Sequence, residues 1–384
     1  MLHRIHLASI FVAACALNAQ AAEPFKVGLI LPLTGPFAST GREISAGVQS
    51  FIAEHPQAAG RKFQIILKDD GGVADNAKRI AQEMVTNERV DAIAGFGTTP
   101  IALASMPVAT LGKTPMIIMG AATSGLPKKS AYVLRTSYST QQVAGPIGEW
   151  AAKFGIKRAM TLVSDMAPGI DEEKTFALFL EKNGGKVVGS LRVPLLNPDF
   201  SPYLQRVADE KPEALYVFIP SGAGAIFMKE VVNRGLTEKG VKLVVEGGVT
   251  DDELLNQMGD EALGVVSGYH YSAAHDSDSN RAFLKAFGKV AGNMRPNFMA
   301  VGGYDGMQML SLALAKSNGE GGLKLIEAAK GLSWESPRGP VSIDPESRDI
   351  VQNIYMRRVE RVNGELYNVE FSTIEKVKDP MLFE

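Results

Sequence analysis

The stretch AGFGTTP, residues 94–100, joins a short apolar run to a helical pattern and carries polar side chains where the two would meet. Gly95 and Gly97 fill the first two positions of the dinucleotide-binding pattern G-x-G-x-x-G, but Pro100 occupies the third. Proline suits the first position of a helix because its φ is already helical and its missing N–H would have no partner there. We therefore expect a strand-to-helix turn that holds something other than a pyrophosphate.

A carboxylate is the group that this turn is predicted to bind. With Thr99 capping the helix, Gly97 and Thr98 complete the turn. Free backbone N–H groups, two hydroxyls and the positive end of the helix dipole then converge on one point. The alternative is that Thr99 only caps its own helix. The residues of this turn by themselves leave both interpretations open.

Two other predicted strand ends in the first half of the chain are also rich in small and polar residues. The apolar run MIIM is followed by Ala121, Ala122 and Thr123, where small side chains would let a ligand approach the backbone. The first predicted strand runs into LPLTGPFASTG, in which Phe37 could cover a cleft. Because strand ends of a parallel sheet lie along one edge, we expect these residues to lie near the turn at 97–99.

Candidates from the second half of the chain follow predicted strands as well, and a later helix adds one tyrosine. They are Ala167, Ser221, Ala223, Gly248, His270, Tyr271 and Tyr304. A hydrolase nucleophile at Ser221 is excluded because G-x-S-x-G would need glycine where Ile219 stands. His270 is either a donor to the ligand or a structural histidine, and Tyr304 either lines the cleft or packs a hinge. We expect no catalytic residue and no metal site.

The composition predicts an exported chain without disulfides. The 384 residues are 45% hydrophobic and carry a formal net charge of −2, which allows two domains and lacks the basic surplus typical of nucleic-acid binding. Residues 1–21 combine a basic start, an apolar stretch and an A-x-A cleavage site, and so predict a signal peptide. The single cysteine, Cys15, lies within it and also fits a lipobox, so a lipid-anchored form is the alternative. We expect neither a thiol nucleophile nor a cysteine zinc site.

The elements that position these residues alternate along the chain. From residue 26, short runs rich in β-branched residues alternate with helical patterns, which predicts α/β lobes with open, mostly parallel sheets flanked by helices. We predict an N-terminal lobe of residues 23–139 plus about 272–345. The C-terminal lobe would comprise residues 140–271 plus about 346–384, and several crossing strands would form the hinge. Two such lobes facing each other form a cleft that closes by hinging.

Six short motifs run in order from about residue 26 to the end of the chain: KVGLILPLTGPFASTG, LKDDGG, AGFGTTP, IMGAATS, YVLRTS and VGGYDGM. Each is weak alone, but in this order they resemble the leucine/isoleucine/valine-type substrate-binding proteins of ABC transporters. The resemblance implies a type I periplasmic-binding fold and no enzymatic activity. It also implies a small bound molecule that is handed to an ABC permease in the inner membrane.

In amino-acid-binding members, the resemblance places the ligand carboxylate against the turn matching residues 97–99 and the loop matching 121–123, both intact here. The ammonium of such ligands meets an aromatic and an acidic residue of the second lobe. Ala167-Pro168 and Gly247-Gly248 stand at the corresponding places of this sequence, although Glu246, Asp251 and Asp252 are close by. We therefore expect the second lobe to lack a dedicated cation partner.

The ligand class follows from that expectation. A buried ammonium without a partner is unfavourable, whereas a carboxylate without an amine needs none. The run GYHYSAAHDS, residues 268–277, also resembles members that bind aromatic carboxylates. We predict a small carboxylate, with an aromatic or aryl 2-oxo acid favoured and a branched-chain or other amino acid as the alternative. A receptor ectodomain would need a membrane span or signalling domain, and an enzyme would need a nucleophile–base pair. We expect a periplasmic monomer that binds no cofactor and no nucleic acid.

Overall fold

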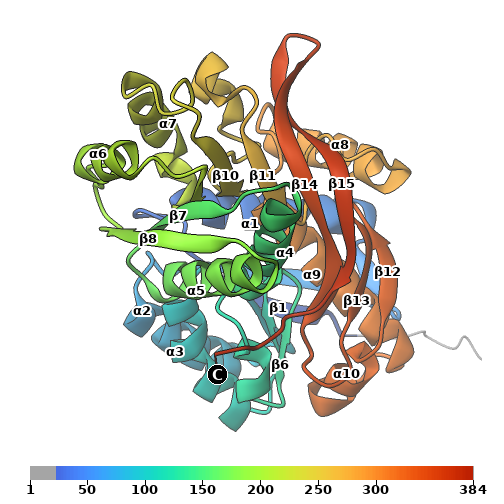
Figure 1. The fold of residues 1–384 in the computed structure, drawn as a ribbon. Helices are drawn as coiled ribbons and strands as arrows, with labels where there is room; N and C mark the ends of the chain where they lie inside the picture. Colours follow the sequence, from blue (N-terminus) through green and yellow to red (C-terminus); the bar gives the residue numbers. More distant parts are fainter. Residues whose placement is uncertain (1–22, 384) are drawn as a thin grey trace, which may run out of the picture.

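The computed structural model describes residues 23–383, so the predicted signal peptide, residues 1–21 with Cys15, lies outside it. The described chain forms two α/β lobes, each built on a sheet with a parallel centre (Figure 1). No helix in this part of the chain has the length and apolar character that a membrane span requires.

The first sheet forms the core of the N-terminal lobe. In spatial order its strands are β2 (Gln57–Ala58), β3 (Arg61–Asp69), β1 (Phe25–Leu31), β4 (Ala92–Gly95), β5 (Met116–Ile118) and β6 (Val133–Arg135). β1 pairs in parallel with β3 and β4, so that Leu29 stands opposite Leu67 and Ala94. Helices cover both faces of this strand, which explains why its sequence is continuously apolar instead of alternating.

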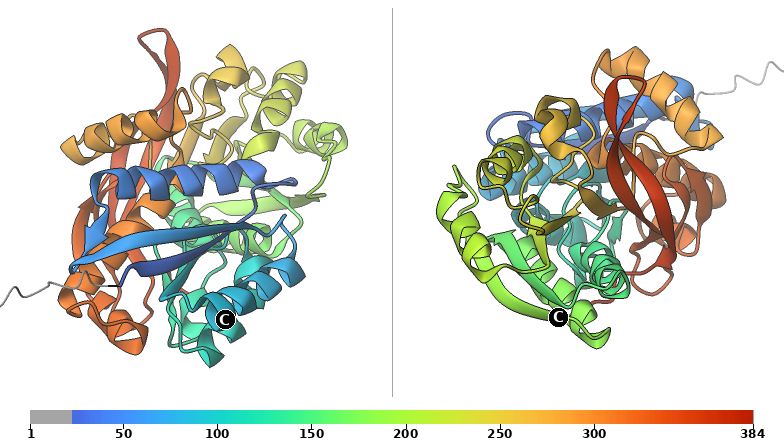
Figure 2. Two further views of the ribbon diagram at one scale, coloured as in Figure 1. Left: turned by 180° about the vertical axis from the view of Figure 1, so that it is seen from behind. Right: turned by 45° about the horizontal axis from the view of Figure 1, so that its top comes forward.

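Two groups of helices cover the first sheet. They are α1 (Ala38–Glu54), α8 (Asp278–Ala291), α9 (Phe298–Lys316) and α10 (Gly322–Ala329) on one face, and α2 (Ala74–Glu83) and α3 (Thr99–Leu111) on the other. α1 packs against β1, α8 and α9, as the view from behind shows (Figure 2). The chain therefore returns to the first lobe after building most of the second.

The second sheet has a parallel part and, beside it, a group of antiparallel strands. Its spatial order is β12 (Ser333–Ser336), β13 (Gly339–Ile343), β14 (Ile350–Val362), β11 (Val266–Tyr269), β10 (Lys242–Glu246), β9 (Ala214–Phe218), β7 (Arg158–Ser164) and β8 (Lys186–Val193). β15 (Glu365–Val377) pairs with β14 in a long hairpin that projects from the body (Figure 1). The parallel part runs from β11 to β8, and the late strands are antiparallel.

Helices also cover both faces of the second sheet. They are α4 (Thr140–Lys153) and α5 (Ala167–Lys182) on one face, and α6 (Ser201–Glu210) and α7 (Gly224–Asn233) on the other. Short irregular turns complete the list: η1 (Met84–Glu88), η2 (Leu126–Lys129), η3 (Ser221–Ala223) and η4 (Leu255–Ala262). The η3 and η4 turns follow β9 and β10, and both lie beside the cleft between the lobes.

Buried ion pairs hold the crossovers between the lobes. The chain passes between the lobes after β6, after β11 and after α10. Arg135, at the end of β6, is fully buried and donates to Asp349 over 2.8 Å. Arg338, also fully buried, donates to Asp305 and to the carbonyl of Ser137 over 2.9 Å each. Removing one partner of such a pair would leave a buried charge uncompensated and would destabilise the protein. The ion pairs therefore hold the crossover segments in place.

The lobe boundaries remain a proposal. α9 packs on α1 and β2 of the first lobe, while α8 packs on α1 and α10 packs on α9, which agrees with assigning residues from about 272 to the first lobe. However, β13 pairs with β14 of the second sheet through Ser342 and Ile343, while Trp334 of β12 donates to Asp305 of α9. We propose that residues 333–343 belong to the hinge instead of to either lobe.

Candidate functional site

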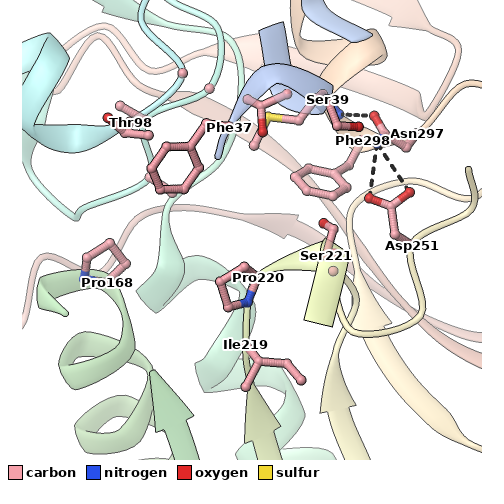
Figure 3. A pocket seen from close by; sticks show the side chains of 18 of the residues that line it. Phe37, Ser39, Thr98, Pro168, Ile219, Pro220, Ser221, Asp251, Asn297 and Phe298 are labelled. Carbon is pink, nitrogen blue, oxygen red and sulfur yellow. Dashed lines mark hydrogen bonds between the residues drawn. The ribbon is translucent and has the colours of Figure 1, made fainter. Parts of the chain in front are cut away.

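A cavity of about 290 Å³ lies between the lobes, at the carboxyl ends of strands from both sheets (Figure 3). The first lobe contributes Pro36, Phe37, Ser39, Thr40, Arg42, Gly97, Thr98, Thr99, Gly120, Ala121 and Ala122. The second contributes Met166, Pro168, Phe218, Ile219, Pro220, Ser221, Gly222, Glu246, Gly248, Asp251, Glu253 and Leu254. The segments beside the crossovers contribute Tyr138, Asn297, Phe298 and Met299.

The turn after β4 has the tight backbone that its glycines predict, but the helix starts one residue earlier than expected. Gly95 has φ +108°, and a side chain there would stand 2.3 Å from the Ile30 carbonyl. Thr98 is the extended N-cap residue of α3, and its side chain makes no capping bond. Thr99 is already helical, so the prediction that Thr99 caps the helix was wrong, because Pro100 is accommodated at the second helical position.

The turn after β4 and the loop after β5 are fastened together. The Met119 N–H donates to the Gly95 carbonyl over 2.8 Å, and the Thr99 and Thr123 hydroxyls are 2.9 Å apart. A side chain at Gly120 would stand 2.9 Å from the Gly97 Cα, so glycine at both positions permits this approach. The two predicted strand-end motifs therefore form one continuous wall.

This wall carries hydrogen-bond donors without protein acceptors. Within residues 23–383, the N–H groups of Thr98, Thr99 and Ala122 donate to no other residue. The Ala121 N–H, by contrast, donates to the Phe96 carbonyl over 2.9 Å and is not available to a ligand. Because two of the free N–H groups lie at the start of α3 and no carboxyl group of the first lobe lines the cavity, this wall favours an anion.

Rings and prolines form the middle of the cavity. Phe37, the residue before α1, extends its ring into the space between the lobes (Figure 3). Pro168, Ile219 and Pro220 lie across from it on the second lobe, and Phe298 lies beside it (Figure 3). A cavity of roughly 150 Å³ is enough for a benzene molecule. The space here therefore accommodates an aromatic ring with polar substituents.

The second-lobe wall is acidic, and this corrects the expectation that it lacks a cation partner. Glu246, Asp251 and Glu253 all line the cavity. The Glu246 carboxylate accepts from the Gly248 N–H over 2.7 Å. Burial raises the pKa of Glu246 to about 7 and that of Asp251 to about 7. The sequence comparison misplaced this acid because β10 ends at Glu246 itself, which brings its side chain to the sheet edge.

Asn297 links the two lobes at one end of the cavity. Its side-chain oxygen accepts from the Met299 N–H over 2.9 Å and so caps α9. Its side-chain nitrogen donates to Asp251 over 3.0 Å (Figure 3). The adjacent Glu43 is fully buried, and burial together with the charges of Glu253 and Asp251 raises its pKa well above the usual value. No group of His, Cys, Asp or Glu in residues 23–383 has an arrangement that could hold a metal ion.

Of the predicted site residues, Phe37, Gly97, Thr98, Thr99, Ala121, Ala122, Ser221 and Gly248 line the cavity. Three others lie just behind its surface. Thr123 reaches only the Thr99 hydroxyl, and Ala167 lies between two lining residues without lining the cavity itself. Ala223 packs on the second hydrophobic core.

The remaining three predicted residues lie outside the cavity lining. His270 is fully buried and stacks on Tyr138 at 4.9 Å between ring centroids. Burial, with Arg338 and Arg357 nearby, lowers the pKa of His270 well below its usual value, so the ring is neutral. Tyr271 is fully buried and its hydroxyl donates to Asn280 over 3.0 Å.

Tyr304 belongs to the packing of the first lobe. Its ring meets those of Phe51 and Phe283 edge-on, at 5.3 and 4.9 Å between centroids. Tyr304 is thus a packing residue of the first lobe, which differs from both interpretations that the sequence left open, a cleft residue and a hinge residue. Its position in the interior of α9 turns it toward α1 and α8 instead of toward the cleft.

Sequence reasoning missed several lining residues. They are Tyr138, Phe218, Ile219, Pro220, Glu246, Asp251, Glu253, Asn297, Phe298 and Met299. The segment 218–220 carried a usable signal, because it follows β9 as the other site residues follow their strands. Tyr138 and residues 297–299 carried no such sequence signal. They line the cavity only because the chain crosses between the lobes near them.

Comparison with known proteins agrees with this architecture. The sequence pattern of the family described as periplasmic binding protein matches residues 24–365. The chain is 42% identical to the Leu/Ile/Val-binding protein homolog 6 of Brucella melitensis, over 99% of both chains.

Solved structures give the same result. The solute-binding protein of an ABC transporter from Rhodopseudomonas palustris BisB5, in complex with 3,4-dihydroxybenzoic acid, is 53% identical with a TM-score of 0.90, over 93% of this chain and 99% of that one. A second solute-binding protein, from Rhodopseudomonas palustris HaA2 with p-hydroxybenzoic acid, is 37% identical with a TM-score of 0.90, over 94% and 99%. The chain thus belongs to the periplasmic binding protein family and is an extracytoplasmic solute-binding protein of an ABC transporter, not an enzyme.

Proposed function

We propose that this protein captures a small aromatic carboxylate, a benzoate-type acid or an aryl 2-oxo acid, between its lobes. The observation that carries the proposal is the division of the cavity into a wall of free N–H donors and a middle of rings and prolines. The complexes of the two Rhodopseudomonas relatives with hydroxybenzoic acids support the same class of ligand.

The ligand carboxylate lies against the first lobe. The N–H groups of Thr98, Thr99 and Ala122 donate to it, and the Thr98 hydroxyl adds a further donor. The ring extends between Phe37 and Pro168. Closure of the second lobe then removes the ring from water, and the ligand favours the closed form only as far as it binds that form better.

A branched-chain amino acid is the second candidate, and one specific observation favours it. Glu246 lines the cavity and could accept an ammonium group. The name of the 42% identical Brucella relative points the same way. The aromatic middle of the cavity and the higher identity to the dihydroxybenzoate complex favour the aromatic acid.

A ligand panel separates the two candidates. Purified protein is heated with benzoate, 4-hydroxybenzoate, 3,4-dihydroxybenzoate, phenylpyruvate, leucine, isoleucine and valine, and the best ligands are then measured by calorimetry. We expect an aromatic acid to raise the unfolding temperature most and to bind in a 1:1 ratio without product formation. A larger shift with leucine would establish the amino-acid alternative.

The partner and location follow from the same proposal. The chain is exported to the periplasm by residues 1–21, acts as a monomer without nucleic acid or cofactor, and delivers its ligand to an ABC permease in the inner membrane. A lipid-anchored form through Cys15 is the alternative product of export. Intact mass measurement of the exported protein distinguishes the two, since lipidation adds a diacylglycerol group at Cys15.

A further inference from the structure

The carboxyl groups of the acidic wall differ in their hydrogen bonds and in their burial. Asp251 accepts from the Glu253 N–H over 2.9 Å and from the Asn297 side chain. Glu253 accepts from the Ser39 hydroxyl over 2.9 Å. Glu246 accepts through Oε2 from the Gly248 N–H over 2.7 Å, and its carboxyl group lies beside the buried Tyr269 hydroxyl. Within residues 23–383 no backbone N–H reaches Oε1 of Glu246.

The position of Glu246 makes its carboxyl group informative. The residue is 2% exposed and lies in the cavity lining at the end of β10. A buried acceptor without a donor is unfavourable unless a ligand or water supplies one. A side chain at Gly248 would stand 2.8 Å from Glu246 Oε2 and 3.6 Å from Ser221 Oγ, so glycine leaves both groups accessible.

Charge fixes which end of the ligand meets this wall. An aromatic acid placed with its carboxylate toward Glu246, Asp251 and Glu253 would bring acidic groups together, whereas the opposite wall offers backbone N–H donors and the cationic Arg42. The part of the ring farthest from the carboxylate therefore faces the second lobe. A hydroxyl there is a donor, and the buried Glu246 carboxyl group, which lies in the cavity lining, can accept a further hydrogen bond beside those from Gly248 and Tyr269.

We propose, building on the proposed function, that Glu246 accepts a hydrogen bond from a ring hydroxyl and thereby selects hydroxylated aromatic acids over the unsubstituted acid. The Ser221 hydroxyl, which lies beside Asp251 in the cavity lining, is placed to contact a second hydroxyl. A site built to bond a hydroxyl rejects an analogue without it, because its own polar group is then left unpaired.

The test compares ligands on the unaltered protein first. Affinities for benzoate, 4-fluorobenzoate, 3-hydroxybenzoate, 4-hydroxybenzoate and 3,4-dihydroxybenzoate are measured by calorimetry. We expect at least one hydroxybenzoate to bind about tenfold to a hundredfold more tightly than benzoate, as a hydrogen bond to a charged group allows. 4-Fluorobenzoate, which cannot donate, should bind no better than benzoate. Equal affinity for benzoate and every hydroxybenzoate would overturn the assignment.

Variants then assign the preference to one residue. Glu246→Gln should reduce the preference for the hydroxylated acid to about threefold or less while benzoate binding persists. Glu261→Gln, which removes an exposed charge from the same lobe, should keep the full preference. A full preference in Glu246→Gln would exclude Glu246 as the acceptor. If no aromatic acid binds the unaltered protein, the proposed function fails instead, and the two failures are thus distinguishable.

Discussion

The Ser39 hydroxyl at the start of α1 donates to the Glu253 carboxylate of the second lobe over 2.9 Å. The bond joins residues 214 positions apart in sequence and spans the cleft between the lobes. Asn297 and Asp251 make a second contact of this kind nearby. Because such contacts exist only when the lobes approach each other, they contribute directly to the balance between open and closed forms.

Replacing Ser39 with alanine should therefore weaken ligand binding without a direct loss of ligand contacts. A partly exposed hydrogen bond contributes about 0.5–1.5 kcal/mol, which predicts roughly a twofold to tenfold loss of affinity. Calorimetry with the best ligand of the panel measures it, and Ser372→Ala, on the exposed part of β15, serves as the control. Unchanged affinity in Ser39→Ala would show that this contact does not affect closure.

Thr98→Ala tests the donor wall. The Thr98 side chain makes no capping bond to α3, so the substitution should leave the unfolding temperature nearly unchanged. If its hydroxyl donates to a ligand carboxylate, the loss is about 1.5–3 kcal/mol, or roughly tenfold to a hundredfold in affinity. Thr110→Ala, on the same helix, removes a hydroxyl that donates to the Met106 carbonyl and should not alter binding. Equal affinities for all three proteins would remove Thr98 from the site.

Glu43 should make the protein less stable as the pH rises. Burial and the charges of Glu253 and Asp251 raise the pKa of Glu43 well above its usual value of 4.5. The folded protein then binds a proton that the unfolded chain has released, so stability is full below the usual pKa and falls as the pH rises toward the raised pKa.

Glu43→Gln removes this dependence. We expect its unfolding temperature to match that of the unaltered protein at about pH 4 and to exceed it by roughly 2 °C or more at about pH 8. Glu54→Gln, an exposed change of equal charge on the same helix, should show no such divergence. The same difference at both pH values would contradict a raised pKa for Glu43.

Gly303→Ala should disturb both the fold and the site. An added Cβ would stand 2.3 Å from the Ile44 carbonyl of α1, so α1 and α9 would have to separate. Overpacking of this kind destabilises by about 1–3 kcal/mol. Because α9 begins at Phe298 in the cavity wall, ligand affinity should fall as well.

Gly288→Ala is the matched control for this glycine. It lies in α8 with no atom within 4 Å of the added Cβ, and the higher helix propensity of alanine should stabilise the protein by up to about 1 kcal/mol. Urea unfolding of both variants measures the difference. Equal stabilities of the two variants would show that the close approach of α1 and α9 tolerates a methyl group.

Local sequence patterns predicted the parallel parts of the fold well. The short apolar run that leads into the turn at 97–99 forms β4, and the KVGLIL part of the first motif falls within β1. Such strands are buried on both faces, so they appear in the sequence as short, continuously apolar runs. Helix starts were less accurate, as at Thr99, because several residues around a proline can each accept the capping role.

For the site, the sequence by itself determined which residues lie at strand ends. It thereby also determined the hydrogen-bond donors of the first lobe, because the local order of strand, turn and helix fixes their positions. Only the tertiary structure decided that Glu246, Asp251 and Glu253 line the opposite wall, that Phe298 reaches the cavity and that His270, Tyr271 and Tyr304 do not. The physical reason is that these positions depend on the crossovers and on how the two lobes meet. Such contacts join residues hundreds of positions apart and leave no local periodicity in the chain.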